Sequence, residues 1–126
     1  MRFLRGSGYA PWRFQRRLAA YLNGLRPHYR TAVLTNAGTD FRATFSRAFQ
    51  LEKIVDEVII SAEEGIAKPD PDIFLLAASR LGVDPQEAVF FDDMPENVDG
   101  ARQAGMQAFH HTDARQTMQA LEKLLQ

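Results

Sequence analysis

Residues 88–97, with the sequence AVFFDDMPEN, decide the fold class more clearly than any other stretch of the chain. The apolar run at 88–91 has no helical period, which predicts a short strand that is buried on both faces. Asp92 and Asp93 end this strand, and a short helix is expected from about residue 96 to residue 104. A buried strand that passes through a polar turn into a helix is typical of a parallel α/β sheet.

The same alternation of strands and helices runs through most of the chain. Short apolar runs predict further strands at residues 31–34, 58–60 and 107–110. Apolar residues at helical spacing predict helices at residues 12–25, 39–51, 70–81 and 114–125, and a polar loop is expected at residues 61–68. The pattern predicts an α/β fold, a Rossmann-like parallel sheet with helices on both faces, in which ligands bind at the carboxyl ends of the strands.

The composition is that of one globular domain and excludes several classes of protein. The chain has 126 residues, 45% of them hydrophobic, a formal net charge of −1 and 0 Cys. Without cysteine there is no disulfide scaffold, no Cys-ligated zinc and no thiol nucleophile. No apolar run approaches the ~18 residues of a membrane span, and no secretory signal is seen near Met1. We therefore expect a cytoplasmic protein that binds neither membrane nor nucleic acid.

Polar residues follow three of the predicted strands at their carboxyl ends. Thr35 and Asn36 follow the first of them, Lys68 lies in the loop after the second, and Asp92 and Asp93 follow the third. A hydroxyl, an amide and an ammonium can hold an anionic oxygen. Adjacent carboxylates repel each other unless they are paired or bind a cation, and hard oxygen ligands suit Mg²⁺. The combination is suited to phosphoryl transfer.

Each of these residues also has a simpler structural interpretation. Thr35 and Asn36 could start a turn, and Lys68 could be an ordinary surface lysine. Helix capping explains one aspartate at 92–93 well but two poorly, and Asn97 could return to the same site. Other polar groups are expected to be structural: His110 and His111, which should point to opposite faces of a strand, and Asp70 and Asp72, which open a helix.

Three stretches of the chain resemble the haloacid dehalogenase-like (HAD) hydrolase superfamily. They are residues 32–36 (AVLTN), 68–74 (KPDPDIF) and 89–98 (VFFDDMPENV), which match the second, third and fourth motifs of the family in order and spacing. The resemblance runs from about Leu18 to the C-terminus and is closest to the subgroup with a helical cap. It implies a Mg²⁺-dependent phosphatase that acts on a small phosphorylated metabolite.

The resemblance also implies a role for each polar residue at the strand ends. Thr35 would hydrogen-bond the transferring phosphoryl group, helped by the backbone of Asn36, and Lys68 would neutralise the charge of that group. The residues expected at the metal are Asp93 as ligand, with Asp92 and Asn97 supporting it through water or through Lys68.

The first motif of the family, an Asp-x-Asp that supplies the nucleophile and the general acid/base, has no counterpart here. Residues 1–39 contain no aspartate. We therefore expect residues 1–30 to be a helical extension resembling the end of a cap, and residues 31–126 to be the core. The sheet is expected to be incomplete, without the family's first strand and most of its cap. The gap could be filled by direct pairing of the flanking strands, by residues 1–4 or by another chain, such as a second copy or a missing N-terminal segment, or it could remain as a defect.

Two functional hypotheses remain open at this point. One is a HAD-like phosphatase whose nucleophile lies outside this chain, so that the chain alone is inactive. The alternative is a non-catalytic HAD-like binding or regulatory module. A receiver domain also uses paired acids, threonine and lysine, but in a different chain order.

Overall fold

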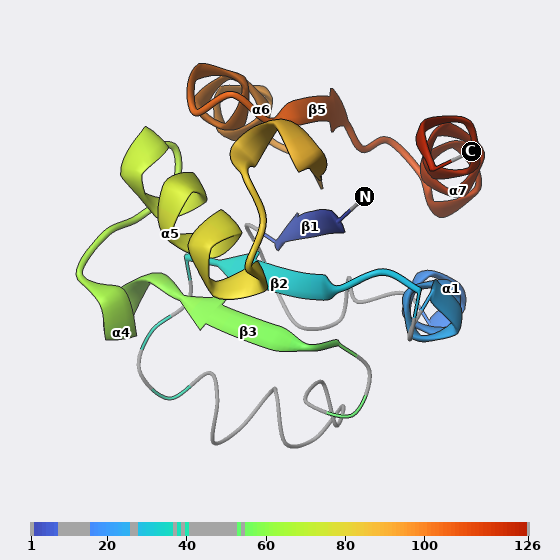
Figure 1. Cartoon of the computed structure of the whole chain (residues 1–126), viewed down its shortest axis with the longest axis horizontal. Coiled ribbons are helices and arrows are strands. Elements are labelled where there is room, and N and C mark those ends of the chain that lie inside the picture. Colours follow the sequence, from blue (N-terminus) through green and yellow to red (C-terminus); the bar gives the residue numbers. More distant parts are fainter. Residues whose placement is uncertain are drawn as a thin grey trace.

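A sheet of five parallel strands runs through the middle of the computed structural model, in the order β3-β2-β1-β4-β5 (Figure 1). The structure describes residues 2–7, 16–25, 28–36, 38, 40, 53 and 55–125. The strands are β1 (Arg2–Ser7), β2 (Thr31–Thr35), β3 (Glu57–Ile60), β4 (Ala88–Asp92) and β5 (Gln107–His110). The parallel α/β fold predicted from the sequence is confirmed.

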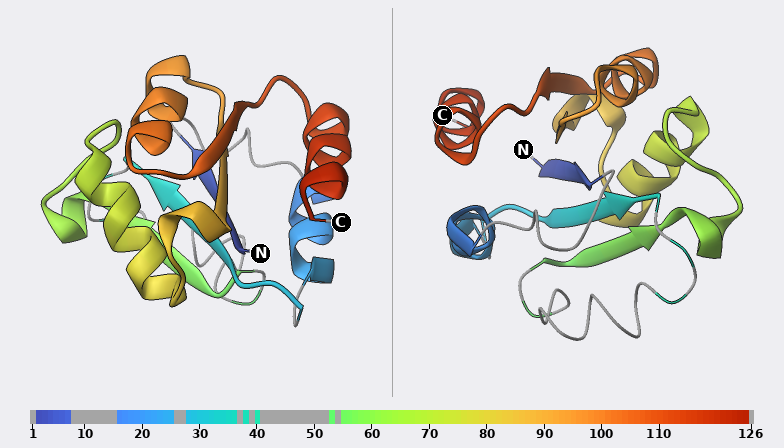
Figure 2. Two further views of the ribbon diagram at one scale, coloured as in Figure 1. Left: turned by 45° about the horizontal axis from the view of Figure 1, so that its top comes forward. Right: turned by 180° about the vertical axis from the view of Figure 1, so that it is seen from behind.

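Helices cover both faces of this sheet, which gives three layers (Figure 2). Helices α1 (Arg16–Leu25) and α7 (Ala114–Leu124) lie side by side on one face. Helices α5 (Pro71–Leu81) and α6 (Pro95–Gln103) lie together on the other face. Two short elements complete the described part of the chain, α4 (Ser61–Glu64) and the 3₁₀ turn η3 (Pro85–Glu87).

Successive residues of β2 and β4 belong to two separate apolar cores, because neighbouring side chains of a strand point to opposite faces. Val33 and Phe91 pack with Leu22 of α1 and Leu121 of α7. The other core lies against α5 and α6 and includes Leu34, Phe74, Phe90 and Ala101. Burial on both faces explains why β2 and β4 appear in the sequence as continuous apolar runs.

The central position of the sheet is occupied by β1, from the N-terminal end of the chain. Its backbone pairs with β2 from Phe3 opposite Thr31 to Ser7 opposite Thr35, and with β4 as far as Arg5 opposite Phe91. Of the four ways to fill the gap, the structure therefore selects the chain's own N-terminal residues. Backbone N–H and C=O groups on both neighbouring strands must be paired, and a strand of almost any sequence can pair them.

The N-terminal region therefore differs from the helical extension expected for residues 1–30, because it holds a core strand as well as α1. Within the expected helix at residues 12–25, the described helical residues are 16–25. Apart from residue 40, the helix expected at 39–51 lies outside the described residues. None of the described helices has the length and apolar character that crossing a membrane requires.

The ends of the later helices follow the sequence signals. Asp70 caps α5, since its side chain accepts the backbone N–H of Asp72 at 2.9 Å. Asp113 caps α7 in the same way through Gln116, at 2.8 Å. The segment 61–68 differs from the expected loop because its first four residues form α4, which ends at Gly65 with a φ of 73°. Serine, alanine and two glutamates are compatible with a single helical turn.

Gly100 of α6 provides a test of how the α6 helix meets the loop after α4. A Cβ atom at this position would lie 2.2 Å from the carbonyl oxygen of Pro69 and 3.0 Å from the ring of Phe74. We predict that Gly100→Ala lowers the free energy of unfolding by about 1–3 kcal/mol, because a backbone oxygen cannot move aside without shifting the loop. Urea denaturation followed by circular dichroism measures the change.

Gly24→Ala is the matched control. Gly24 lies in α1, and a Cβ atom added to it would meet nothing within 4 Å, so alanine should stabilise the helix by about 0.5–1 kcal/mol. Equal stability of Gly100→Ala and the wild type would contradict the close approach of α6 to Pro69.

Candidate active site

A fully buried ion pair lies at the carboxyl end of β4. The Nζ atom of Lys68 is 2.8 Å from Oδ2 of Asp92, and neither side chain has any exposed area. The same oxygen accepts a hydrogen bond from Nδ2 of Asn97 at 3.1 Å, and Oδ1 accepts the backbone N–H of Met94 at 3.0 Å. Asp92 thus connects the loop after α4, which holds Lys68, with the turn after β4 and the first turn of α6.

The charge of Asp92 is maintained by its partners. Burial alone would raise the pKa of this carboxyl group, because a low-dielectric interior disfavours the charged form. The nearby Lys68 ammonium, together with hydrogen bonds that involve Asp93, Lys68 and Met94, outweighs burial and holds the pKa of Asp92 below its usual value. The two side chains therefore form a true ion pair at neutral pH.

The backbone of Lys68 is held from the other side of the site, at the end of β2. Its N–H donates to Oδ1 of Asn36 at 2.9 Å, and its carbonyl oxygen accepts from Nδ2 of Asn36 at 3.0 Å. Thr35, the last residue of β2, is buried with 3% of its surface exposed. Asn36 and Lys68 are therefore in direct contact, and Thr35 is the residue that precedes Asn36.

The two aspartates at the end of β4 lie in different surroundings. Asp92 is buried and engaged with an ammonium and two N–H donors, whereas Asp93 is half-buried. The searched part of the chain contains no group of three or more His, Asp or Glu residues able to hold a metal ion. Mg²⁺ is commonly bound through one or two protein carboxylates together with phosphate oxygens and water. Asp93 is a carboxylate of the kind that takes part in such partial sites, while Asp92 and Asn97 are engaged with each other.

His110, the last residue of β5, and His111, which follows it, contact backbone and hydroxyl groups near the site. Nε2 of His110 lies 2.9 Å from the backbone carbonyl oxygen of Asp93. The backbone N–H of His111 donates to the carbonyl oxygen of Asp92 at 2.8 Å, and its Nδ1 lies 2.5 Å from Oγ1 of Thr117. Sequence reasoning missed these contacts, since no motif marks a backbone carbonyl as a partner.

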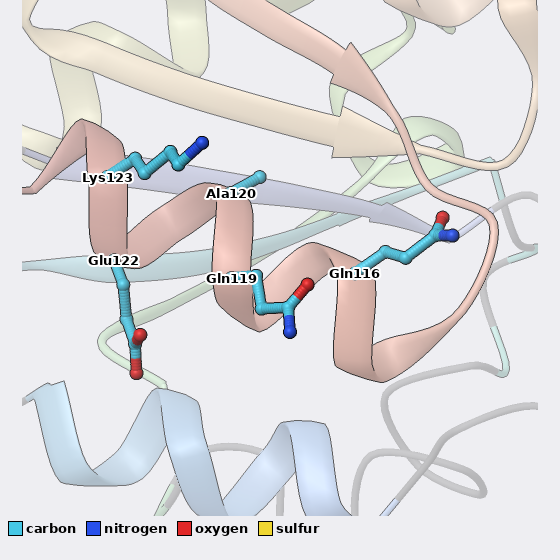
Figure 3. A pocket seen from close by; sticks show the side chains of 5 residues that line it. All are labelled: Gln116, Gln119, Ala120, Glu122 and Lys123. Atoms are coloured by element: carbon cyan, nitrogen blue, oxygen red, sulfur yellow. The ribbon is translucent and has the colours of Figure 1, made fainter.

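A separate hollow of about 570 Å³ lies on α7 (Figure 3). Its lining includes Gln116, Gln119, Ala120, Glu122 and Lys123. The Glu122 side chain points toward α1 in this view. These residues do not include any member of the Lys68–Asp92 cluster, so the hollow is a different feature from the candidate site.

Comparison with known proteins identifies the family. A family model described as haloacid dehalogenase-like hydrolase matches residues 15–105. The chain therefore belongs to the haloacid dehalogenase-like hydrolases, as its three motifs suggested.

The curated relatives include sugar-phosphate and triose-phosphate phosphatases. Glyceraldehyde 3-phosphate phosphatase of Methanopyrus kandleri is 53% identical over 51 residues, which are 40% of this chain and 22% of that protein. Fructose-1-phosphate phosphatase YqaB of Escherichia coli is 41% identical over 86 residues, which are 68% of this chain and 44% of that protein. The chain thus spans less than half the length of these relatives.

Solved structures share the fold over most of the chain. An uncharacterized protein from Corynebacterium glutamicum is 27% identical with a TM-score of 0.77, covering 98% of this chain and 94% of that one. A predicted HAD-like hydrolase from Porphyromonas gingivalis is 30% identical with a TM-score of 0.76, covering 89% and 58%. A HAD family enzyme from Bacteroides thetaiotaomicron, in complex with magnesium and inorganic phosphate, is 25% identical with a TM-score of 0.64, covering 84% and 54%.

The buried pair allows a test by charge removal. Lys68→Met leaves the Asp92 carboxylate buried without its ammonium, and we predict a loss of about 3–5 kcal/mol in the free energy of unfolding. The double variant Lys68→Met/Asp92→Asn removes both charges and should recover part of that loss. Urea denaturation at pH 7 measures both. Equal losses in the single and double variants would show that the two charges are not coupled.

The lowered pKa of Asp92 predicts a dependence of stability on pH. A carboxylate whose pKa is lower in the folded state stabilises the protein above its unfolded pKa of about 4, and this contribution is lost as the pH falls through the folded value. The difference in unfolding free energy between wild type and Asp92→Asn should therefore shrink below about pH 4. Asp99→Asn, on an exposed residue of α6, is the control. The prediction would be contradicted if the difference in unfolding free energy between wild type and Asp92→Asn stayed constant between pH 7 and about pH 3.

Proposed function

We propose that this chain carries the phosphoryl-binding part of a HAD-type phosphatase site, in a protein that hydrolyses a small phosphate monoester. The observation that carries the proposal is the buried Lys68 ammonium, which Asp92 holds at the carboxyl edge of the sheet. Membership of a hydrolase family and relatives named as phosphatases support it. Ligands of open α/β sheets bind at this edge, outside the ends of the strands.

The chain's own residues would bind and orient the phosphoryl group. Thr35 ends β2 next to the Asn36–Lys68 contact and would donate its hydroxyl to a phosphoryl oxygen. The Lys68 ammonium would stabilise the negative charge of that group, and a charge that is already fixed in position costs little reorganisation when the ligand arrives.

Mg²⁺ is the cofactor that we propose for this site. Asp93 would hold the ion, while Asp92 and Asn97 would fix the turn behind it through their hydrogen bond. When bound, the ion would offset negative charge on the phosphoryl oxygens. The complex of the Bacteroides thetaiotaomicron enzyme with magnesium and inorganic phosphate supports this choice.

We further propose that the chain alone has little or no phosphatase activity. The strand beside Thr35 is β1, and its sequence RFLRGS contains no carboxylate. The resemblance assigns the nucleophile and the acid/base to an Asp-x-Asp motif on the central strand, and a covalent route requires that nucleophile. A network around Lys68 that is intact without this motif also supports the second candidate, a module that binds phosphorylated ligands without turning them over.

Two measurements test this proposal. With Mg²⁺ and an aryl phosphate, we expect the turnover of the wild type to be no higher than that of Asp93→Ala. With Mg²⁺ and inorganic phosphate, calorimetry should show binding by the wild type and by the exposed-site control Asp99→Asn, and weaker binding by Asp93→Ala. Robust turnover that Asp93→Ala abolishes would refute inactivity. A wild type that binds no phosphate would refute the phosphoryl-binding role.

A further inference from the structure

The side chain of Asn36 contacts Lys68 in an unusual way for a residue at a strand end. Both of its amide atoms bind the backbone of Lys68, one accepting the N–H at 2.9 Å and the other donating to the C=O at 3.0 Å. A side-chain amide has one acceptor and one donor group, so it reproduces the pairing that a neighbouring strand would offer. Two contacts on one residue fix its orientation as well as its position.

Lys68 connects two strands that are not neighbours in the sheet, one through its backbone and the other through its side chain. Its backbone is bound at Asn36, immediately after β2, and its ammonium is bound at Asp92, the last residue of β4. Strand β1 lies between β2 and β4 in the sheet. The contacts of Lys68 therefore lie at the ends of the two strands that flank β1.

The backbone contact matters because a lysine side chain is long and flexible. Its ammonium is a point charge on a four-carbon stem, so its location depends on where the backbone is fixed. On the other side of the same loop, Pro69 lies close to Gly100 of α6, as shown by the distance of 2.2 Å to a Cβ built there. Glu64 and Arg80 also tie α4 to α5, but this ion pair is at the surface, where such pairs contribute little.

We infer that Asn36 is a positioning residue, whose side-chain amide sets the location of the Lys68 ammonium by clamping the Lys68 backbone. Both of its amide atoms are engaged in this contact. The inference rests on the proposed function for the role of Lys68, whereas the clamp itself can be tested without any ligand.

The first test observes the Lys68 ammonium directly by ¹⁵N NMR of the ligand-free protein. The signal is assigned by its loss in Lys68→Met, or in the milder Lys68→Arg if the methionine variant does not fold. In Asn36→Ala we expect the ammonium protons to exchange with water about tenfold faster, since the two hydrogen bonds that fix the Lys68 backbone are lost. Asn36→Asp keeps the acceptor for the Lys68 N–H and loses the donor, so its exchange rate should be intermediate.

Asn23→Ala is the matched control, because Asn23 is an exposed asparagine on α1. In Asn23→Ala the exchange rate of the Lys68 ammonium protons should equal that of the wild type. This comparison separates positioning from a general effect of replacing an asparagine. An unchanged signal and exchange rate in folded Asn36→Ala would overturn the inference. If Asn36→Ala does not fold, Asn36→Asp decides by the same criterion against the wild type.

The second test connects the clamp to the proposed function. Calorimetry with inorganic phosphate and Mg²⁺ should show binding about tenfold weaker in Asn36→Ala than in the wild type. Tenfold corresponds to about 1.4 kcal/mol of binding free energy. Equal affinity would overturn the role of the clamp in ligand binding. If the wild type binds no phosphate, the proposed function fails, and the NMR result still decides whether Asn36 positions Lys68.

Discussion

The ion pair between Lys68 and Asp92 is the interaction on which the organisation of the site depends. Two charges without any solvent exposure are stable only when each is paired and the remaining polar atoms are bonded. Asp92 meets this condition through Asn97 and the backbone of Met94, and Lys68 is fixed through Asn36. The pair therefore connects β2, the loop before α5, β4 and α6 into one arrangement at the carboxyl edge of the sheet.

The central strand imposes a second constraint, because β2 and β4 leave room for one strand between them. Residues Arg2–Ser7 fill that position through backbone pairing on both sides. The similarity to the Corynebacterium glutamicum structure covers 94% of that chain. A chain of similar extent therefore forms the same architecture.

Much of the fold could be predicted from sequence because its signals are local. The apolar runs of β2 and β4 and the caps at Asp70 and Asp113 lie where the sequence placed them. Strand β1 could not be recognised, since RFLRGS has no continuous apolar run and its pairing is made by backbone groups. The site residues could be named from their motifs. The different surroundings of Asp92 and Asp93, and the hold of Asn36 on Lys68, depend on side-chain directions that no spacing reveals.

Pairing through the backbone leaves the identity of the residues in β1 weakly constrained by the sheet itself. The registers on both sides are set by N–H and C=O groups, which every non-proline residue carries. The sheet alone therefore tolerates many different residues along β1. What the side chains of this strand decide is the chemistry presented at its carboxyl end, where ligands of open α/β sheets bind.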